Sequence, residues 1–155
     1  MGTNRILTAQ HIYAAMLRAE IAPRVRALGF KGSGPAFVLP DEDWWLIVAF
    51  QKDRYSRADC VRFTVNLTVA NKQAWAADRA YEPSLPIRPS GNTQYSPDTA
   101  RVIRLGNLLP PRREDRWWEV GPRRPSKPAA TRVADAIERV ALPWLRQEAR
   151  RSWTG

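Results

Sequence analysis

The sequence predicts an α+β protein of two layers, in which helices at both ends of the chain cover one face of a largely antiparallel sheet. Three observations support this fold class. Helical periodicity occupies both ends of the chain, the middle alternates in polarity as strands do, and no repeat or break in composition divides the sequence. We expect four or five strands and a single domain over residues 1–155, a length that suits one hydrophobic core.

The first helix is expected between Thr8 and Leu28. Apolar residues recur there every three to five positions, which is typical of a helix with one buried stripe. Thr8 is a suitable N-cap, and Gly29 can adopt the left-handed conformation that ends a helix. Pro23 has no amide hydrogen, so we expect a kink or a break at that point.

Two longer strands are expected in the middle of the chain. Trp44–Lys52 is almost continuously apolar, which suits the centre of a sheet. In the strand at residues 60–70, apolar residues alternate with polar ones, so Arg62, Thr64 and Asn66 share one face. The seven residues between the two strands suit an antiparallel hairpin.

The remaining elements are shorter or interrupted by proline. Further strands are expected at residues 36–39, 101–109 and 117–120. The Pro-rich segment at about 77–100 has no periodicity and is expected to form a long loop. A final helix is expected over residues 129–150, with a kink at Pro143.

Adjacent tryptophans occur twice on the expected strands, at Trp44-Trp45 and at Trp117-Trp118. Neighbouring strand residues point to opposite faces, so one ring of each pair is expected away from the helices. Exposed rings beside arginines suit stacking or a protein interface. Core packing is the simpler explanation for most of the seven tryptophans.

The net charge of +10 is concentrated in the C-terminal third of the chain. Residues 101–155 carry +7, whereas residues 1–50 carry +1 and residues 51–100 carry +2. Such a basic segment attracts nucleic acid or acidic protein surfaces. Arginine supplies 21 of the 25 basic residues, so GC-rich codon usage is a second explanation, and both stay open.

The candidate binding residues lie on the polar strand face and in the basic C-terminal third. With helices on one face only, the polar face would be an open surface, on which Thr64→Asp is better tolerated than Val65→Asp in the core. Ordinary solvation of that face is the alternative. The candidates are Arg62, Thr64, Asn66, Arg104, Arg112, Arg113, Arg116, Arg123 and Arg124.

The residues that carry chemistry are few. His11 is the only histidine and Cys60 the only cysteine, so we expect no catalytic residue, no metal site and no cofactor. The lone cysteine excludes an intramolecular disulfide and favours a reducing, cytoplasmic location. No apolar stretch approaches the roughly 20 residues of a membrane helix.

Several short motifs, taken in order, resemble a family of small bacterial proteins called domain of unknown function 4304. They include Gly29-Phe30-Lys31, Phe37, Gln51-Lys52, Phe63-Thr64-Val65-Asn66-Leu67, Arg104-Leu105-Gly106 and Trp117-Trp118. The resemblance covers nearly the whole chain and implies an α+β fold. It brings no established activity or catalytic residue, and the chain is more basic and Pro-rich after residue 100 than that pattern.

These observations favour a non-enzymatic binding module for an anionic macromolecule or an acidic protein surface. One alternative is a toxin-immunity-type protein that masks an acidic partner, which a neighbouring toxin gene would favour. The other is an enzyme with a pocket between the polar strand face and the 77–100 loop. That enzyme requires a deep pocket containing Arg62 and Asn66.

Overall fold

The structure is a computed structural model that describes residues 7–151. Its helices are α1 (Ala9–Met16), α2 (Ala22–Ala27), α3 (Lys72–Tyr81), α4 (Ser126–Ala136) and α5 (Leu142–Arg150). Its strands are β1 (Lys31–Ser33), β2 (Ala36–Leu39), β3 (Trp44–Lys52), β4 (Val61–Asn71), β5 (Arg101–Arg104) and β6 (Trp118–Val120). A 3₁₀ turn, Leu105–Leu108, follows β5.

The six strands form one antiparallel sheet centred on the β3–β4 hairpin. Its order is β1-β2-β3-β4-β5, and β6 also pairs with β4. β5 and β6 share one edge of β4, because β6 pairs with residues 61–63 and β5 with residues 66–69. The predicted α+β fold and antiparallel sheet are confirmed, with one strand more than the expected maximum.

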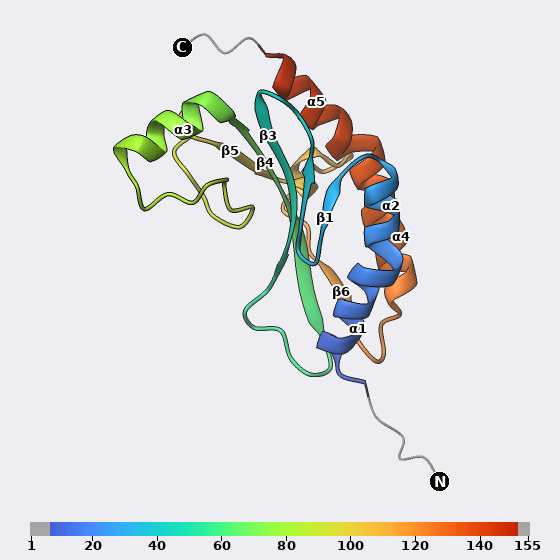
Figure 1. The fold of residues 1–155 in the computed structure, drawn as a ribbon. Coiled ribbons are helices and arrows are strands. Elements are labelled where there is room, and N and C mark those ends of the chain that lie inside the picture. Colours follow the sequence, from blue (N-terminus) through green and yellow to red (C-terminus); the bar gives the residue numbers. More distant parts are fainter. Residues whose placement is uncertain (1–6, 152–155) are drawn as a thin grey trace.

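The apolar face of β4 packs against the helices from both ends of the chain, as Figure 1 shows. Alternate residues of β4 lie in this core, namely Val61, Phe63, Val65, Leu67 and Val69. α1 packs beside α4, so the two terminal helices form one layer. The expectation that both helices cover the same face of the sheet is confirmed.

Each terminal helix contains a proline shortly after a π-helical turn. The turn Leu17–Ile21 precedes Pro23, and the turn Ile137–Ala141 precedes Pro143. A proline within a helix clashes with the carbonyl group four residues earlier and cannot donate a hydrogen bond. The wider π turn accommodates both effects, so the chain remains helical on either side of each proline.

The expectation of a loop from residue 77 is wrong for residues 77–81, which belong to α3. Asn71 caps this helix, because its side-chain oxygen accepts a hydrogen bond from the Ala74 amide at 3.0 Å. Trp75 is the only buried residue of α3. The segment therefore lacks the repeated apolar positions that make a helix recognisable in a sequence.

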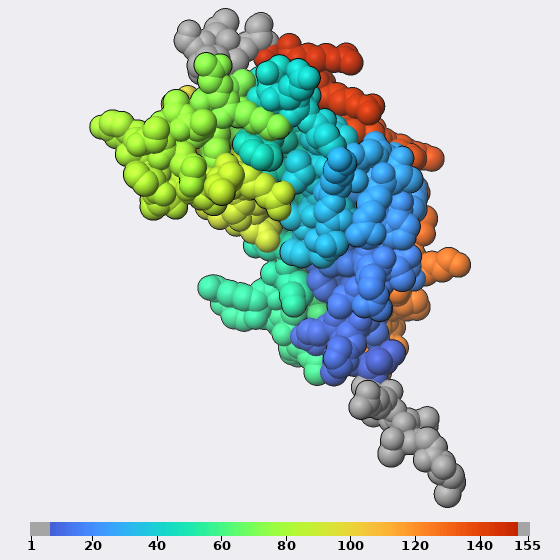
Figure 2. Space-filling model, in the orientation of Figure 1, coloured from blue at the N-terminus to red at the C-terminus, as the bar shows by residue number. Residues whose placement is uncertain are grey.

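α3 and the irregular segment 82–100 lie on the sheet face opposite the terminal helices (Figure 1). A small second core holds them there, with Ala70, Trp75 and Ala100 buried and Trp45 partly buried. In Figure 2 this lime and yellow layer stands beside the sheet, with a hollow between it and the teal hairpin loop. The layer therefore covers only one end of that face.

Candidate binding surface

The polar face of β4 is not the open surface that its alternation predicts. Thr64 is 0% exposed and Asn66 is 3% exposed. The Thr64 hydroxyl donates a hydrogen bond to the Arg116 carbonyl oxygen at 2.8 Å. The Asn66 amide donates to Gln51 at 2.8 Å and to Asn92 at 3.0 Å. Both side chains are therefore buried parts of the fold. Burial at position 64 removes the reason for expecting Thr64→Asp to be tolerated, because the aspartate would be buried.

Segments distant in sequence cause this burial. The 82–100 segment reaches the sheet at Gly91, where a Cβ atom would overlap with the side chain of Ala49. Residues 114–116 cross β4 in the gap between β5 and β6 and cover Thr64. At Gly91 the 82–100 segment therefore packs directly on β3.

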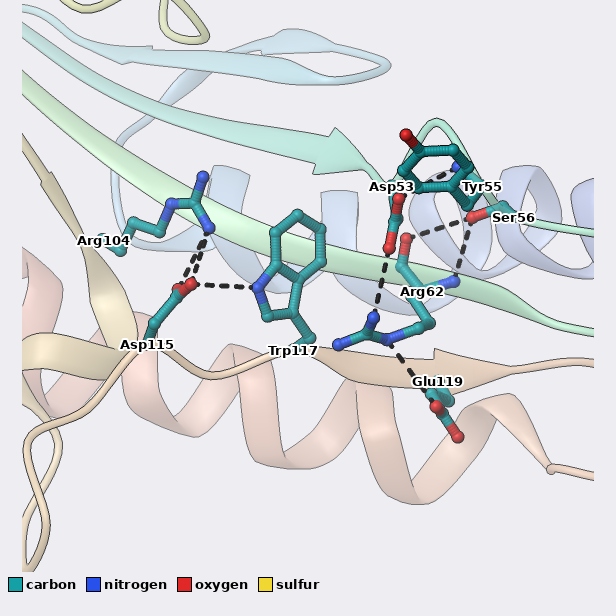
Figure 3. A network of polar contacts seen from close by, with 8 residues as sticks. All are labelled: Asp53, Tyr55, Ser56, Arg62, Arg104, Asp115, Trp117 and Glu119. Carbon is teal, nitrogen blue, oxygen red and sulfur yellow. Dashed lines mark hydrogen bonds and ion pairs between the residues drawn. The ribbon is translucent and has the colours of Figure 1, made fainter.

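Each tryptophan pair is divided between the two faces, as the strand geometry predicts. Trp118 and Trp44 pack with the helix-side core, whereas Trp45 packs with the second core. Trp117 lies between Arg104 and Arg62 in Figure 3. The guanidinium carbons are 4.9 and 5.4 Å from the centre of its ring, within the range of cation–π contacts.

Carboxylates balance both arginines of this cluster. Arg104 forms an ion pair with Asp115 at 2.9 Å, and the Trp117 indole donates to the same carboxylate at 3.1 Å. Arg62 pairs with Asp53 at 3.2 Å and with Glu119 at 3.7 Å (Figure 3). These pairs anchor the 115–119 segment on the sheet and compete with any external anion for Arg62 and Arg104.

The arginines predicted in the two Pro-rich turns divide into paired and unpaired groups. Arg112 lies 3.8 Å from Glu114, and Arg124 pairs with Glu119. Within residues 7–151, no carboxylate lies within ion-pair distance of Arg113, Arg116 or Arg123. Only this second group offers a charge that is not already balanced by a neighbour.

Arg116 and Arg132 line one shallow cavity of about 550 Å³ between the 109–118 segment and α4. Leu109, Pro110 and Trp118 supply much of its apolar wall. Arg132 has no ion-pair partner among the described residues, because Asp135 of the same helix pairs with Arg24 at 2.8 Å. Asp135 also lines the cavity, so the cavity combines an apolar wall, a carboxylate balanced by Arg24, and two arginines without an ion-pair partner among the described residues.

Sequence reasoning identified Arg116 but missed Arg132. Helical periodicity places Arg132 on the exposed side of α4, where it resembles any solvated arginine. The two residues come together because Leu105–Leu108 packs against the π turn Ile137–Ala141, which brings the following turn to α4. No local sequence signal encodes that contact.

The structure shows little that suggests metal or membrane chemistry. Within residues 7–151, histidine, cysteine, aspartate and glutamate side chains form no group of three that could hold a metal ion. Over the same residues, no helix has the length and apolar character needed to cross a bilayer.

The structure defines an α+β protein whose antiparallel sheet carries a main core on one face and a small second core on the other. Residues 21–147 match the family model described as domain of unknown function (DUF4304), and the chain belongs to this family. No curated protein and no solved structure matches the chain. The resemblance noted in the sequence motifs is thereby confirmed, and it assigns a family without an activity.

Proposed function

We propose that this protein is a non-enzymatic binding module for an anionic macromolecule. The observation that carries the proposal is the convergence of Arg116 and Arg132 on one cavity, whose lining carboxylate, Asp135, forms its ion pair with Arg24 and not with either of them. A guanidinium group is always charged and can donate paired hydrogen bonds to a phosphate or carboxylate. Two such groups beside an apolar wall form a surface that attracts an acidic group.

The neighbouring turn strengthens this surface. Arg113 and Arg116 belong to the same short segment, and Arg113 is also without a carboxylate partner among residues 7–151. Arg62, Arg104 and Arg124, by contrast, already pair with acids of the chain. Of the predicted binding residues, we retain Arg113 and Arg116 for this surface, add Arg132, and assign Thr64 and Asn66 to the fold.

Retention on immobilised heparin tests the proposal without requiring a known ligand. The R116S/R132S variant should elute at clearly lower salt than the wild-type protein, because two uncompensated charges are lost. The matched control is R54S/R88S, which removes two exposed arginines from loops that do not line the cavity shared by Arg116 and Arg132. Circular dichroism should show both variants folded, since exposed charges contribute little to stability.

If GC-rich codon usage alone explains the arginine excess, the two variants should behave alike on heparin. In that case the two variants lose the same amount of retention, because only total charge matters. Equal elution of R116S/R132S and R54S/R88S would therefore contradict a localised surface. Failure of the wild-type protein to bind heparin at physiological salt would contradict the proposal itself.

A separate observation favours a protein as partner, as in the toxin-immunity alternative. Tyr55 is 73% exposed and its ring contacts the guanidinium of Arg54 at 4.9 Å. Tyr55 and the unpaired Arg123 line a second cavity of about 910 Å³ beside the hairpin loop. Exposed tyrosine and arginine are typical of protein-interface hot spots.

An experiment distinguishes the anion-binding function from the toxin-immunity function. If the product of an adjacent toxin gene binds this protein, Tyr55→Ala should weaken that complex and leave heparin retention unchanged. Loss of heparin retention in Tyr55→Ala, or the repeated absence of a toxin gene beside this one, would count against the immunity role.

A further inference from the structure

The solvent-facing side of α4, the π turn Ile137–Ala141 and α5 carries a row of three arginines. Arg132, Arg139 and Arg146 are seven residues apart and all exposed. Arg139 lies in the π turn Ile137–Ala141, whose wider turn shifts the helical phase, so the three side chains share the solvent-facing side of the helix without forming a straight line. At 1.5 Å per residue the row spans about 21 Å. The row begins at Arg132, which lines the cavity shared with Arg116.

Few acids oppose these charges. Along α4, the π turn and α5, Glu138 is the only exposed acidic residue. Asp135 pairs with Arg24, and Glu148 is buried against Arg101. None of the three arginines has an ion-pair partner among residues 7–151. The row therefore carries uncompensated positive charge.

The residues exposed on α4 and α5 indicate which class of anionic partner suits this surface. The large apolar residues that are exposed in residues 7–151 are Leu7, Tyr55, Tyr81 and Ile87, and none lies on α4 or α5. A helix that lies on a membrane needs such residues on its exposed face. A protein interface needs a buried apolar or aromatic anchor. Beyond the cavity wall at Arg132, the arginine row has neither, which favours a partner recognised through its charge.

Single-stranded nucleic acid is less suited to this face than a duplex. Proteins bind single strands largely by stacking bases on aromatic side chains. Two tryptophans line the cavity, and neither is free to stack. Trp117 is held between Arg62 and Arg104 (Figure 3), and Trp118 is buried in the helix-side core. A duplex presents regularly spaced phosphates without exposing its bases, and about 21 Å corresponds to roughly six base pairs.

We infer that the arginine row of α4 and α5, continued by Arg116 at its start, binds the phosphate backbone of a nucleic-acid duplex without reading its sequence. The inference rests on the proposed function and names its partner class. Double-stranded DNA and double-stranded RNA share this chemistry. The arginine row does not distinguish DNA from RNA, so the experiment tests both kinds of duplex.

Fluorescence anisotropy with a labelled duplex of about 20 base pairs measures the row directly, with DNA and RNA in separate arms. Each phosphate contact contributes about 0.9 to the slope of log affinity against log salt. The R139S/R146S variant should therefore lose about 2 from that slope and bind roughly tenfold more weakly. R139K/R146K should retain most of the affinity, because lysine also contacts phosphate as a point charge.

The control R54S/R88S should bind the duplex like the wild-type protein. A wild-type slope in R139S/R146S, or a single strand bound as tightly as the duplex, would overturn the inference. Heparin retention separates this failure from that of the proposed function. If R116S/R132S loses retention while R139S/R146S binds duplex normally, the module still binds anions but the arginine row does not. If wild-type protein binds neither heparin nor duplex, both proposals fail.

Discussion

The hydroxyl of Tyr13 is buried without a hydrogen-bond partner among the described residues. Its ring packs against Phe63, with ring centres 5.2 Å apart, within the helix-side core. Burial raises the pKa of Tyr13 well above its ordinary value, because the phenolate would lose its solvation. This side chain is thus held neutral by the fold.

Tyr13 makes the stability of the protein sensitive to alkaline pH. A raised pKa in the folded state means that its contribution is complete below the unfolded value of about 10 and is lost as the pH rises above it. We expect Tyr13→Phe to reduce this alkaline loss and to change the free energy of unfolding by less than about 1 kcal/mol at neutral pH. Urea unfolding across pH measures both effects.

Tyr81→Phe is the matched control, because Tyr81 is 94% exposed. Its alkaline profile should follow that of the wild-type protein. If Tyr13→Phe also follows the wild-type profile, the Tyr13 hydroxyl is not held neutral by burial.

The segment 82–100 is an element without regular structure, held to the sheet by specific contacts. Asn92 accepts a hydrogen bond from Asn66, and the indole of the buried Trp75 donates to the carbonyl oxygen of Pro86 at 3.0 Å. Gly91 is buried where the segment meets β3. Close approach of the backbone, rather than a turn, explains glycine at this position.

We expect Gly91→Ala to destabilise the protein by about 1–3 kcal/mol, because the added methyl group overlaps with Ala49. Hydrogen exchange should accelerate within residues 82–100 more than in β4. Thr93→Ala, at an exposed neighbouring position, should leave both measurements unchanged. A Gly91→Ala protein that melts like the wild type would show that the segment does not pack against Ala49.

At the scale of the whole molecule, an ion pair joins the C-terminal helix to the edge of the sheet. The side chain of Glu148 in α5 is 8% exposed and lies 2.6 Å from Arg101 in β5. Arg101 also lies 5.7 Å from the ring centre of Trp144. Glu148 is the one buried acidic residue in the described part of the chain.

Substitution of Arg101 and substitution of Glu148 should reduce the free energy of unfolding by different amounts. Arg101→Met leaves the largely buried carboxylate of Glu148 with only the more distant Arg151, 3.7 Å away. We expect this substitution to reduce the free energy of unfolding by about 1–3 kcal/mol. Glu148→Met should cost less, because Arg101 keeps access to water and no buried charge remains. Urea unfolding of the two single variants measures the difference. A larger cost for Glu148→Met would contradict this explanation.

Local patterns in the sequence were enough to predict the framework of the molecule. Alternation from Val61 to Val69 identified the core face of β4. Strand geometry also predicted that adjacent tryptophans would point to opposite faces of the sheet, as Trp44 and Trp45 do. Thr8 caps the first helix, and Gly29 follows it with a φ of 106°. Each of these features depends on residues a few positions apart, so side-chain periodicity and backbone preference determine them.

Only the tertiary structure decided which polar residues remain available to a partner. Thr64 is covered by a residue 52 positions away, and Asn66 is bonded to one 26 positions away. Likewise, packing of distant segments places Arg116 beside Arg132 and pairs Arg104 with Asp115. A strand's alternation separates its two faces, but it carries no information on what covers each face, because that depends on contacts between distant parts of the chain.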